Sequence, residues 1–281
     1  MRFYTKQPQF YCGIDLHART MSLCLVNQAG EILVHRTMPA GPDPFLKVVA
    51  PYREDLVVCV ACLFTWYGLA DLGAREGQPF VLGHALSMKA IPGGTATNDQ
   101  IDAQKIAVLL RGGMLPQAYV YPAEMRATRA LLRRRIPLMR KRAEWLGHLP
   151  QTHSQYNVPA MGQKIASKAN RASVAERFLE SAVQQRIDVA LALLDHDDCL
   201  RRARELTSLK TAKQHEATTL YLLRTVPGRG ESLRLVLLSD VHAIARFPRV
   251  QDVVSYGRLV KCAKASAGQR YGTSGTTIGN A

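Results

Sequence analysis

The sequence lacks the features that mark a membrane, secreted or fibrous protein. Its longest uncharged hydrophobic run extends from Leu56 to Ala70, which is too short to span a lipid bilayer. No apolar run near the N-terminus leads to a small-residue cleavage site, so no secretory signal peptide is predicted. We also find no internal repeat and no low-complexity tract. A hydrophobic content of 47% therefore predicts a globular protein that does not associate with a membrane.

Cysteine is scarce, with six residues scattered through a chain of 281. Without a secretory signal, this pattern predicts reduced thiols and a cytoplasmic protein. Cys59 and Cys62 have the spacing of half a zinc site, but no second pair is spaced to complete it. We therefore expect these two side chains to pack in a core.

Acidic residues are few, with 22 of them against 37 lysines and arginines, which gives a net charge of +15. The imbalance is not uniform, because residues 1–103 hold eight basic and nine acidic residues and the remainder carries the excess. A near-neutral front joined to a strongly basic back favours a polyanionic partner, most simply nucleic acid. The alternative, a basic surface kept for solubility, is usually spread over the whole chain.

The front third alternates short strand-like runs with helical spacing of apolar residues. The predicted strands are Phe10–Ala18, Thr20–Val26, Glu31–Met38, Leu56–Val60 and Pro79–Leu82. The predicted helices are Pro44–Ala50, Thr65–Glu76 and Asp99–Arg111. The order β-β-β-α-β-α-β-α is that of the ribonuclease H-like fold, so we predict an α/β domain of this type over residues 1–120.

Residues 121–212 are predicted to form a basic helical arm, with long helices over 124–149 and 174–209 joined by a connection at 150–170. Pro137 is expected to kink or break the first helix. That helix carries eight basic residues and two acidic ones, which favours a face that follows phosphates over an ordinary solvated face. Its candidate nucleic-acid-binding residues are Arg126, Arg129, Arg133, Arg134 and Arg135.

Residues 213–281 are predicted to form a mostly α-helical C-terminal domain. The segment Leu222–Gly230 ends in Pro-Gly-Arg-Gly between two helical runs, which is the pattern of a helix–hairpin–helix. Gly228 and Gly230 would let backbone N–H groups approach a DNA phosphate beside a helix N-terminus. An ordinary corner between two helices fits the same segment equally well.

Three acidic residues are predicted to converge at one edge of the front domain. Asp15 lies inside the first apolar strand, where an unpaired carboxylate is costly. Asp99 and Asp102 share one face at the start of a helix that meets this strand in a ribonuclease H-like fold. Such hard oxygen ligands suit Mg²⁺ or Mn²⁺ and the chemistry of phosphoryl transfer. Asp99 taken alone is more simply a helix N-cap.

The strings GIDLHA, FTWYGLAD and NDQIDAQKIA, followed by TVPGRG, RFPRVQDVVSYGRLVKCAK and SAGQRYGTSG, resemble a known family. They are similar to the DEDD-type, RuvC-like transposases of the insertion-sequence "one-ten" family, which are related to Piv-type invertases. The resemblance covers the chain from about residue 10 to its end. It implies a bacterial cytosolic enzyme that cuts and rejoins DNA and is guided by a structured RNA, often called a bridge RNA.

The resemblance also implies roles for particular residues. Asp15, Asp99 and Asp102 would hold the metal, and Ser266 would be the nucleophile that forms a covalent link to DNA. Ser274 is the weaker candidate, because its surroundings also fit a simple turn. Metal and serine sites on different chains would require a homo-oligomer, a dimer or a tetramer. Two basic residues close before the serine are expected to hold the scissile phosphate rather than be ordinary surface charges; they are Arg258 and Lys261.

Two departures from the family pattern predict weak activity. The second acid of the family, a glutamate, is matched here by Ala61, which cannot bind a metal. The chain also stops at Ala281, where family members usually continue into another helix, so the C-terminal domain is expected to be incomplete. Two alternatives stay open: a catalytically dead remnant that binds nucleic acid, and a metal-dependent junction nuclease that uses water instead of Ser266.

Overall fold

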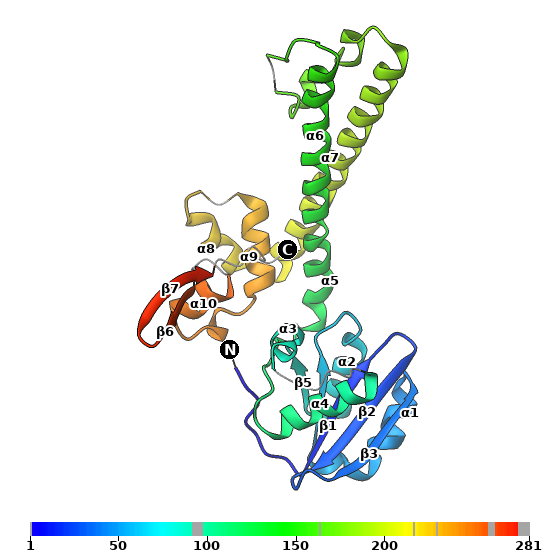
Figure 1. Cartoon of the computed structure of the whole chain (residues 1–281), viewed down its shortest axis with the longest axis vertical. Helices are drawn as coiled ribbons and strands as arrows, with labels where there is room; N and C mark the ends of the chain where they lie inside the picture. The colour runs from blue at the N-terminus through cyan, green and yellow to red at the C-terminus, as the bar shows by residue number, and fades with distance from the viewer. Residues whose placement is uncertain are drawn as a thin grey trace. The chain divides into compact units, whose positions relative to one another are not determined.

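The computed structural model describes residues 2–91, 98–162, 164–215, 217–228, 230–257 and 262–274 (Figure 1). The chain divides into two compact units, Met1–Ala123 and Glu124–Ala281. The second unit contains all but the first three residues of the predicted arm (121–212) and the whole predicted C-terminal domain (213–281), and the separation of these two parts stays a prediction. No helix in the described parts of the chain is both long enough and apolar enough to cross a bilayer.

The first unit is built on a five-stranded mixed sheet with the order β3-β2-β1-β4-β5. The strands are β1 (Phe10–Leu16), β2 (Thr20–Asn27), β3 (Ile32–Pro39), β4 (Leu56–Ala61) and β5 (Phe80–Gly83). β1, β2 and β3 pair antiparallel, whereas β4 is parallel to both β1 and β5. This confirms the predicted meander and the ribonuclease H-like order of elements.

Helices cover both faces of this sheet, because its central strands are apolar on both sides. One face packs against α1 (Pro42–Val49) and α2 (Tyr67–Glu76). The other packs against α3 (Ala85–Lys89) and α4 (Asp99–Arg111), as Figure 1 shows for α4 across β1 and β2. The bounds of α4 are those predicted, whereas the short α3 was not predicted.

Gly13 allows α4 to approach β1 very closely. A Cβ atom at this position would lie 2.3 Å from the carbonyl oxygen of Ala103 and 2.4 Å from the backbone nitrogen of Ala107. Both neighbours are backbone atoms of α4, which cannot move aside without the whole helix. The small side chains of Ala103 and Ala107 are themselves fully buried. The glycine in Gly-Ile-Asp therefore determines how near the start of α4 comes to Asp15.

Replacing Gly13 with alanine should destabilise the protein by about 1–3 kcal/mol, the usual cost of overpacking a core. Urea unfolding followed by circular dichroism measures this change. The matched control is Gly68→Ala in α2, where an added Cβ meets no atom within 4 Å. An alanine at position 13 that left stability unchanged would contradict the close packing of α4 on β1.

The second unit is mainly helical. Its elements are α5 (Ala123–Arg133), α6 (Arg135–Gln155), α7 (Ser181–His215), α8 (Ala217–Thr225), α9 (Glu231–Val241), α10 (Val250–Tyr256) and the hairpin β6 (Cys262–Ser266) and β7 (Gln269–Ser274). α6 and α7 lie side by side (Figure 1). This confirms a helical region with long helices, to which the structure adds a β-hairpin that was not predicted.

The prolines of the arm behave differently from one another. The helix breaks at Arg134, three residues before Pro137, because the proline ring excludes the carbonyl one turn earlier. Pro150, which was predicted to begin a connection, instead lies inside α6, which continues to Gln155. The neighbouring Leu149 is buried in the core at the end of the arm, and this packing outweighs the hydrogen bond that the proline removes.

The segment between α6 and α7 is folded onto these helices rather than being a simple linker. α7 begins at Ser181, seven residues later than predicted, because residues 164–180 form short 3₁₀ turns (Lys168–Asn170 and Ala175–Arg177). The buried guanidinium of Arg171 bonds Asp195 and Asp198 of α7 and the carbonyl oxygens of Ile165 and Ala166. One arginine thus ties this segment to the arm.

Candidate metal centre and nucleic-acid surfaces

Asp15 is a buried carboxylate at the C-terminal end of β1, on the face of the sheet that α4 covers. The Asp15 residue as a whole is 9% exposed to solvent. Burial raises the pKa of the Asp15 carboxyl, His17 lowers it, and the charges of Asp99 and Asp102 raise it again. The net direction is upward chiefly because burial disfavours the charged carboxylate, and a bound cation would favour it.

The start of α4 supplies the other two carboxylates. Asn98 is the N-cap, and its side-chain oxygen accepts a hydrogen bond from the backbone nitrogen of Ile101 at 2.8 Å. The predicted alternative for Asp99, a helix N-cap, is therefore wrong, and its carboxylate can face Asp15. Asp99 and Asp102 both lie in the first helical turn, where the positive end of the helix dipole favours negative charge.

His17 lies between the two nearest carboxylates. Its Nε2 atom is 3.5 Å from Oδ2 of Asp15 and 3.5 Å from Oδ1 of Asp99. One ligand atom from each of these three residues lies within 4.8 Å of the others. The structure thus brings Asp15 and Asp99 together as the sequence analysis expected, with Asp102 acting on Asp15 through its charge. Their role as metal ligands stays a prediction.

The donor set fits a divalent cation. Carboxylate oxygens are the preferred ligands of Mg²⁺ and Mn²⁺, and an imidazole nitrogen is accepted by Mn²⁺. Burial is the main cause of the raised pKa of the Asp15 carboxyl, Asp99 and Asp102 add to it, and a cation bound here would offset these effects. The site is therefore chemically suited to a divalent cation, whose identity the residues alone do not fix.

Ala61 occupies the position nearest to Asp15 on the neighbouring strand. The parallel register pairs Ile14 of β1 with Val60 of β4, so the next residues along are Asp15 and Ala61. Ala61 packs against the cluster under α4, the same face that carries Asp15. A longer acidic side chain at position 61 would therefore reach the carboxylates, and the alanine leaves that side of the site without a charge.

The loop after β4 is anchored to the same edge of the sheet. The hydroxyl of Thr65 donates a hydrogen bond to the carbonyl oxygen of Leu16 at 2.9 Å. Trp66, which follows, is buried in the core, whereas Phe64 is 85% exposed. The Phe-Thr-Trp segment therefore fixes the end of β4 against the end of β1 and keeps the acidic residues in register.

The predicted basic face of the arm is largely committed to internal ion pairs. Arg129 lies 3.0 Å and Arg133 3.7 Å from Asp240 of α9. Arg135 lies 2.9 Å from Glu205 of α7. Arg126 is buried, and Arg134 is exposed to solvent. Among these five arginines, Arg134 is therefore the best placed to meet a phosphate, while three of the others join helices of the second unit.

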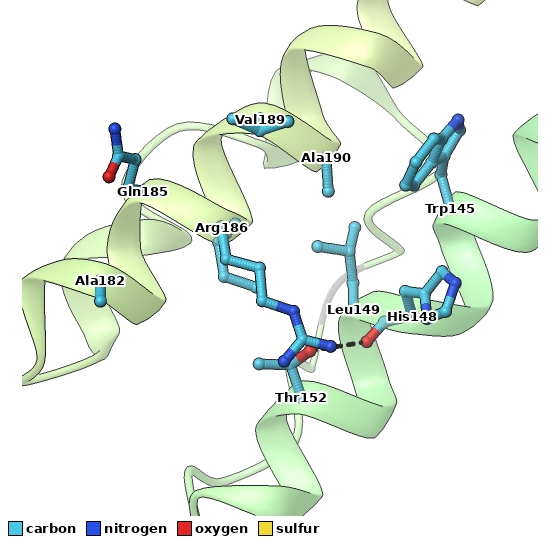
Figure 2. A pocket seen from close by; sticks show the side chains of 10 residues that line it. Trp145, His148, Leu149, Thr152, Ala182, Gln185, Arg186, Val189 and Ala190 are labelled. Atoms are coloured by element: carbon cyan, nitrogen blue, oxygen red, sulfur yellow. Dashed lines mark hydrogen bonds between the residues drawn. The ribbon is translucent and has the colours of Figure 1, made fainter.

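A pocket of about 440 Å³ lies between α6 and α7 (Figure 2). The indole of Trp145 and the imidazole of His148 stand on its α6 side, and the guanidinium of Arg186 extends across it from α7. Flat rings beside a guanidinium are groups on which unpaired bases stack. The sequence analysis did not identify this pocket, because its walls come from residues some forty positions apart in the chain.

The helix–hairpin–helix segment forms a turn between α8 and α9. Gly228 has φ of +76°, a value that favours glycine, and Gly230 is the N-cap of α9. This geometry is compatible with both interpretations of the segment, a phosphate-binding turn and an ordinary turn between two helices. Phosphate binding there stays a prediction.

The candidate nucleophile Ser266 is exposed at the tip of the C-terminal hairpin. It is the last residue of β6 and pairs with Gln269 across a two-residue turn. Ala267 and Gly268 have φ of +49° and +76°, as a tight hairpin turn requires. The weaker candidate, Ser274, ends β7. Arg258 and Lys261 lie outside the described residues.

Sequence reasoning missed His17 and the ion-pair network of the arm. A signal for His17 was present, because residues two apart on a strand share a face and His17 follows Asp15 at that spacing. No comparable signal existed for Arg171, whose partners Asp195 and Asp198 become neighbours only through the folding of the segment between α6 and α7.

Comparison with known proteins identifies related sequences and structures. Residues 12–157 match the DEDD transposase family of IS110, and residues 220–281 match the transposase family IS116/IS110/IS902. No curated protein sequence matches the chain. A structure of Thermus thermophilus RuvC in complex with a Holliday junction substrate is 13% identical, with a TM-score of 0.31, and covers 39% of this chain and 99% of that chain. Another T. thermophilus RuvC structure is 15% identical, with a TM-score of 0.28 and the same coverage.

Proposed function

Because this chain belongs to the IS110 family of DEDD transposases, we propose that it cuts and rejoins DNA at a divalent cation held by Asp15, Asp99 and Asp102. The family makes it a DNA transposase or recombinase, and the details of the site are our proposal. The observation that carries them is the convergence of the buried Asp15 with Asp99 at the end of β1.

A bound Mg²⁺ or Mn²⁺ would polarise a phosphoryl oxygen and stabilise the charge of the leaving oxygen. The chain's own residues prepare this site before any substrate arrives. Gly13 brings α4 close to β1, Asn98 caps α4 in place of Asp99, and Thr65 ties the loop after β4 to β1. These contacts hold the carboxylates on rigid elements, which is what a site for phosphoryl transfer requires.

Ser266 is proposed as the nucleophile. In this step the hydroxyl oxygen bonds to the scissile phosphorus and its proton passes to water, while the bond from phosphorus to the departing sugar oxygen breaks and that oxygen takes a proton from water. Exposure at a hairpin tip supports this role, because the oxygen must reach a phosphate of the DNA. From the family resemblance we also propose a homo-oligomer in which the divalent-cation site of one chain faces Ser266 of another.

We further propose that the basic second unit binds a structured guide RNA. Outside residues 1–103 the chain carries most of its positive charge, and Arg134 and Arg186 are exposed. The pocket with Trp145 and Arg186 offers a ring and a cation to an unpaired base (Figure 2).

Ala61 favours an impaired enzyme over a fully active one. It stands beside Asp15, where an acid would complete the ligand set, so the site binds its cation with one carboxylate fewer. A catalytically dead remnant that binds nucleic acid is the second candidate, and the same alanine is the observation in its favour. The intact convergence of Asp15 and Asp99 supports retained activity instead.

The test is a recombination assay with the ends of the element, a target DNA, the flanking RNA and Mg²⁺. Ala61→Glu should raise the yield of joined product about 10–100-fold, the range in which even indirect partners of a metal change its affinity. The control is Ala29→Glu, which adds the same charge at an exposed turn beside the start of β1, the opposite end of that strand.

The outcomes separate the parts of the proposal. Equal activity of both variants and the original chain would show that a fourth acid is unnecessary here. Joined product without added RNA would contradict RNA guidance. A complete lack of product from every variant, with DNA and RNA still bound, would favour the dead remnant.

A further inference from the structure

We propose that His17 is a direct ligand of the divalent cation and takes the place of the acid that Ala61 lacks. This inference rests on the proposed metal site and adds a nitrogen donor to its carboxylates. It distinguishes this chain from an enzyme that binds its cation through oxygen atoms alone, and it assigns a catalytic residue that the sequence pattern of four acids does not contain.

The position of His17 follows from strand geometry. Asp15 is the penultimate residue of β1, and residues two apart along an extended chain point to the same side. The Nε2 atom of His17 therefore arrives beside the Asp15 carboxylate, and Asp99 reaches it from the first turn of α4. Three donor atoms from two elements surround one point at the edge of the sheet.

The two contacts are long for direct ion pairs and leave His17 Nε2 within reach of a cation shared with both carboxylates. Ligands at about 2.1 Å from a six-coordinate cation lie about 3.0 Å apart when adjacent and about 4.2 Å apart when opposite. Both contacts of His17 Nε2 are 3.5 Å, between these two separations, so a small closure would bring the donors into adjacent positions around one cation. A charge-assisted hydrogen bond from a protonated imidazole would instead be about 2.7–2.9 Å long. The imidazole is half-exposed, so its Nε2 atom is accessible to a cation that enters from solvent.

The nitrogen donor changes which cation the site prefers. Four carboxylates would suit Mg²⁺, whereas three carboxylates and an imidazole carry less negative charge and a softer atom. Mn²⁺ accepts imidazole more readily than Mg²⁺ does. The chain should therefore bind Mn²⁺ more tightly than Mg²⁺, and His17 should be responsible for much of that preference.

The experiment is Mn²⁺ binding to the full-length protein, followed by electron paramagnetic resonance. The pulsed spectrum should contain a ¹⁴N coupling from a directly bound imidazole. His17→Ala should remove that coupling and weaken Mn²⁺ binding at least about tenfold, because even outer partners of a metal cost that much. His196→Ala, which removes an exposed histidine on α7, is the matched control and should change neither quantity. Thermal unfolding without metal verifies that each variant folds.

Three other outcomes would overturn the inference in distinguishable ways. Mn²⁺ bound without a ¹⁴N coupling would exclude His17 as a ligand and leave the carboxylate site intact. A coupling that persists in His17→Ala would assign the nitrogen to another residue. No specific Mn²⁺ binding by the original chain would reject both this inference and the metal site of the proposed function.

Discussion

Asp15→Asn should abolish divalent-cation binding and reduce DNA strand cleavage at least about 100-fold, yet make the metal-free protein more stable. The loss of cleavage follows from the several kcal/mol that a cation contributes to phosphoryl transfer, at about 1.4 kcal/mol for each factor of ten. The gain in stability follows from the buried charge. Asp15 faces Asp99 and Asp102, and the pKa of its carboxyl is raised by burial and by these neighbours.

The direction of the pH dependence is fixed by that raised pKa. A carboxyl whose pKa is higher in the folded than in the unfolded protein binds more protons when folded, so stability falls as the pH rises through this range. The asparagine variant lacks the penalty. The stability of Asp15→Asn should therefore exceed that of the original protein most at neutral pH. The difference should vanish below about pH 4, where the Asp15 carboxyl is protonated in both the folded and the unfolded protein.

Thermal unfolding in the presence of a chelator, at neutral and at acid pH, measures this difference. The expected rise in Tm at neutral pH is a few degrees, at about 2–8 °C for each kcal/mol of stability gained by removing the buried charge. Asp188→Asn, which removes an exposed carboxylate on α7, is the control and should leave Tm and cleavage unchanged. A less stable asparagine variant at neutral pH would show that Asp15 contributes attractive contacts that outweigh its repulsion.

The elements of the first unit could be predicted because local pattern and tertiary environment agree there. Strands buried on both faces read as continuous apolar runs, and α4 carries its apolar residues on one side. The convergence of Asp15 and Asp99 then followed from topology, since the end of β1 and the start of α4 meet in this fold. The geometry of that meeting depends on Gly13, whose role only the backbone contacts reveal.

The second unit was harder to predict because an arginine can contact nucleic acid or form an internal ion pair, and the sequence does not distinguish these two roles. Charge patterning identified a basic helix, but not that Arg129 and Arg135 are paired with Asp240 and Glu205. These acids lie more than sixty residues away, so the pairing depends on how the helices pack. The same limit applies to Pro150, where burial of Leu149 overrides the local preference for ending a helix.

Ser266→Ala should eliminate the covalent link between protein and DNA and, with it, the joined product. The substitution removes the hydroxyl oxygen that would attack phosphorus, and an alanine side chain offers no replacement. Because Ser266 is exposed at the tip of the β6–β7 hairpin, its loss should leave the fold unchanged. The measurement is denaturing electrophoresis of labelled DNA after reaction, in which a covalent adduct migrates with the protein.

Two further serine variants serve as controls for this result. Ser255→Ala removes an exposed hydroxyl on α10 and should retain the adduct. Ser274→Ala tests the weaker candidate at the end of β7 and should retain it as well. Cleavage that continues in Ser266→Ala without any adduct would identify water as the nucleophile. The protein would then be a metal-dependent junction nuclease, because the carboxylates at the end of β1 can serve an attacking water as well as an attacking hydroxyl.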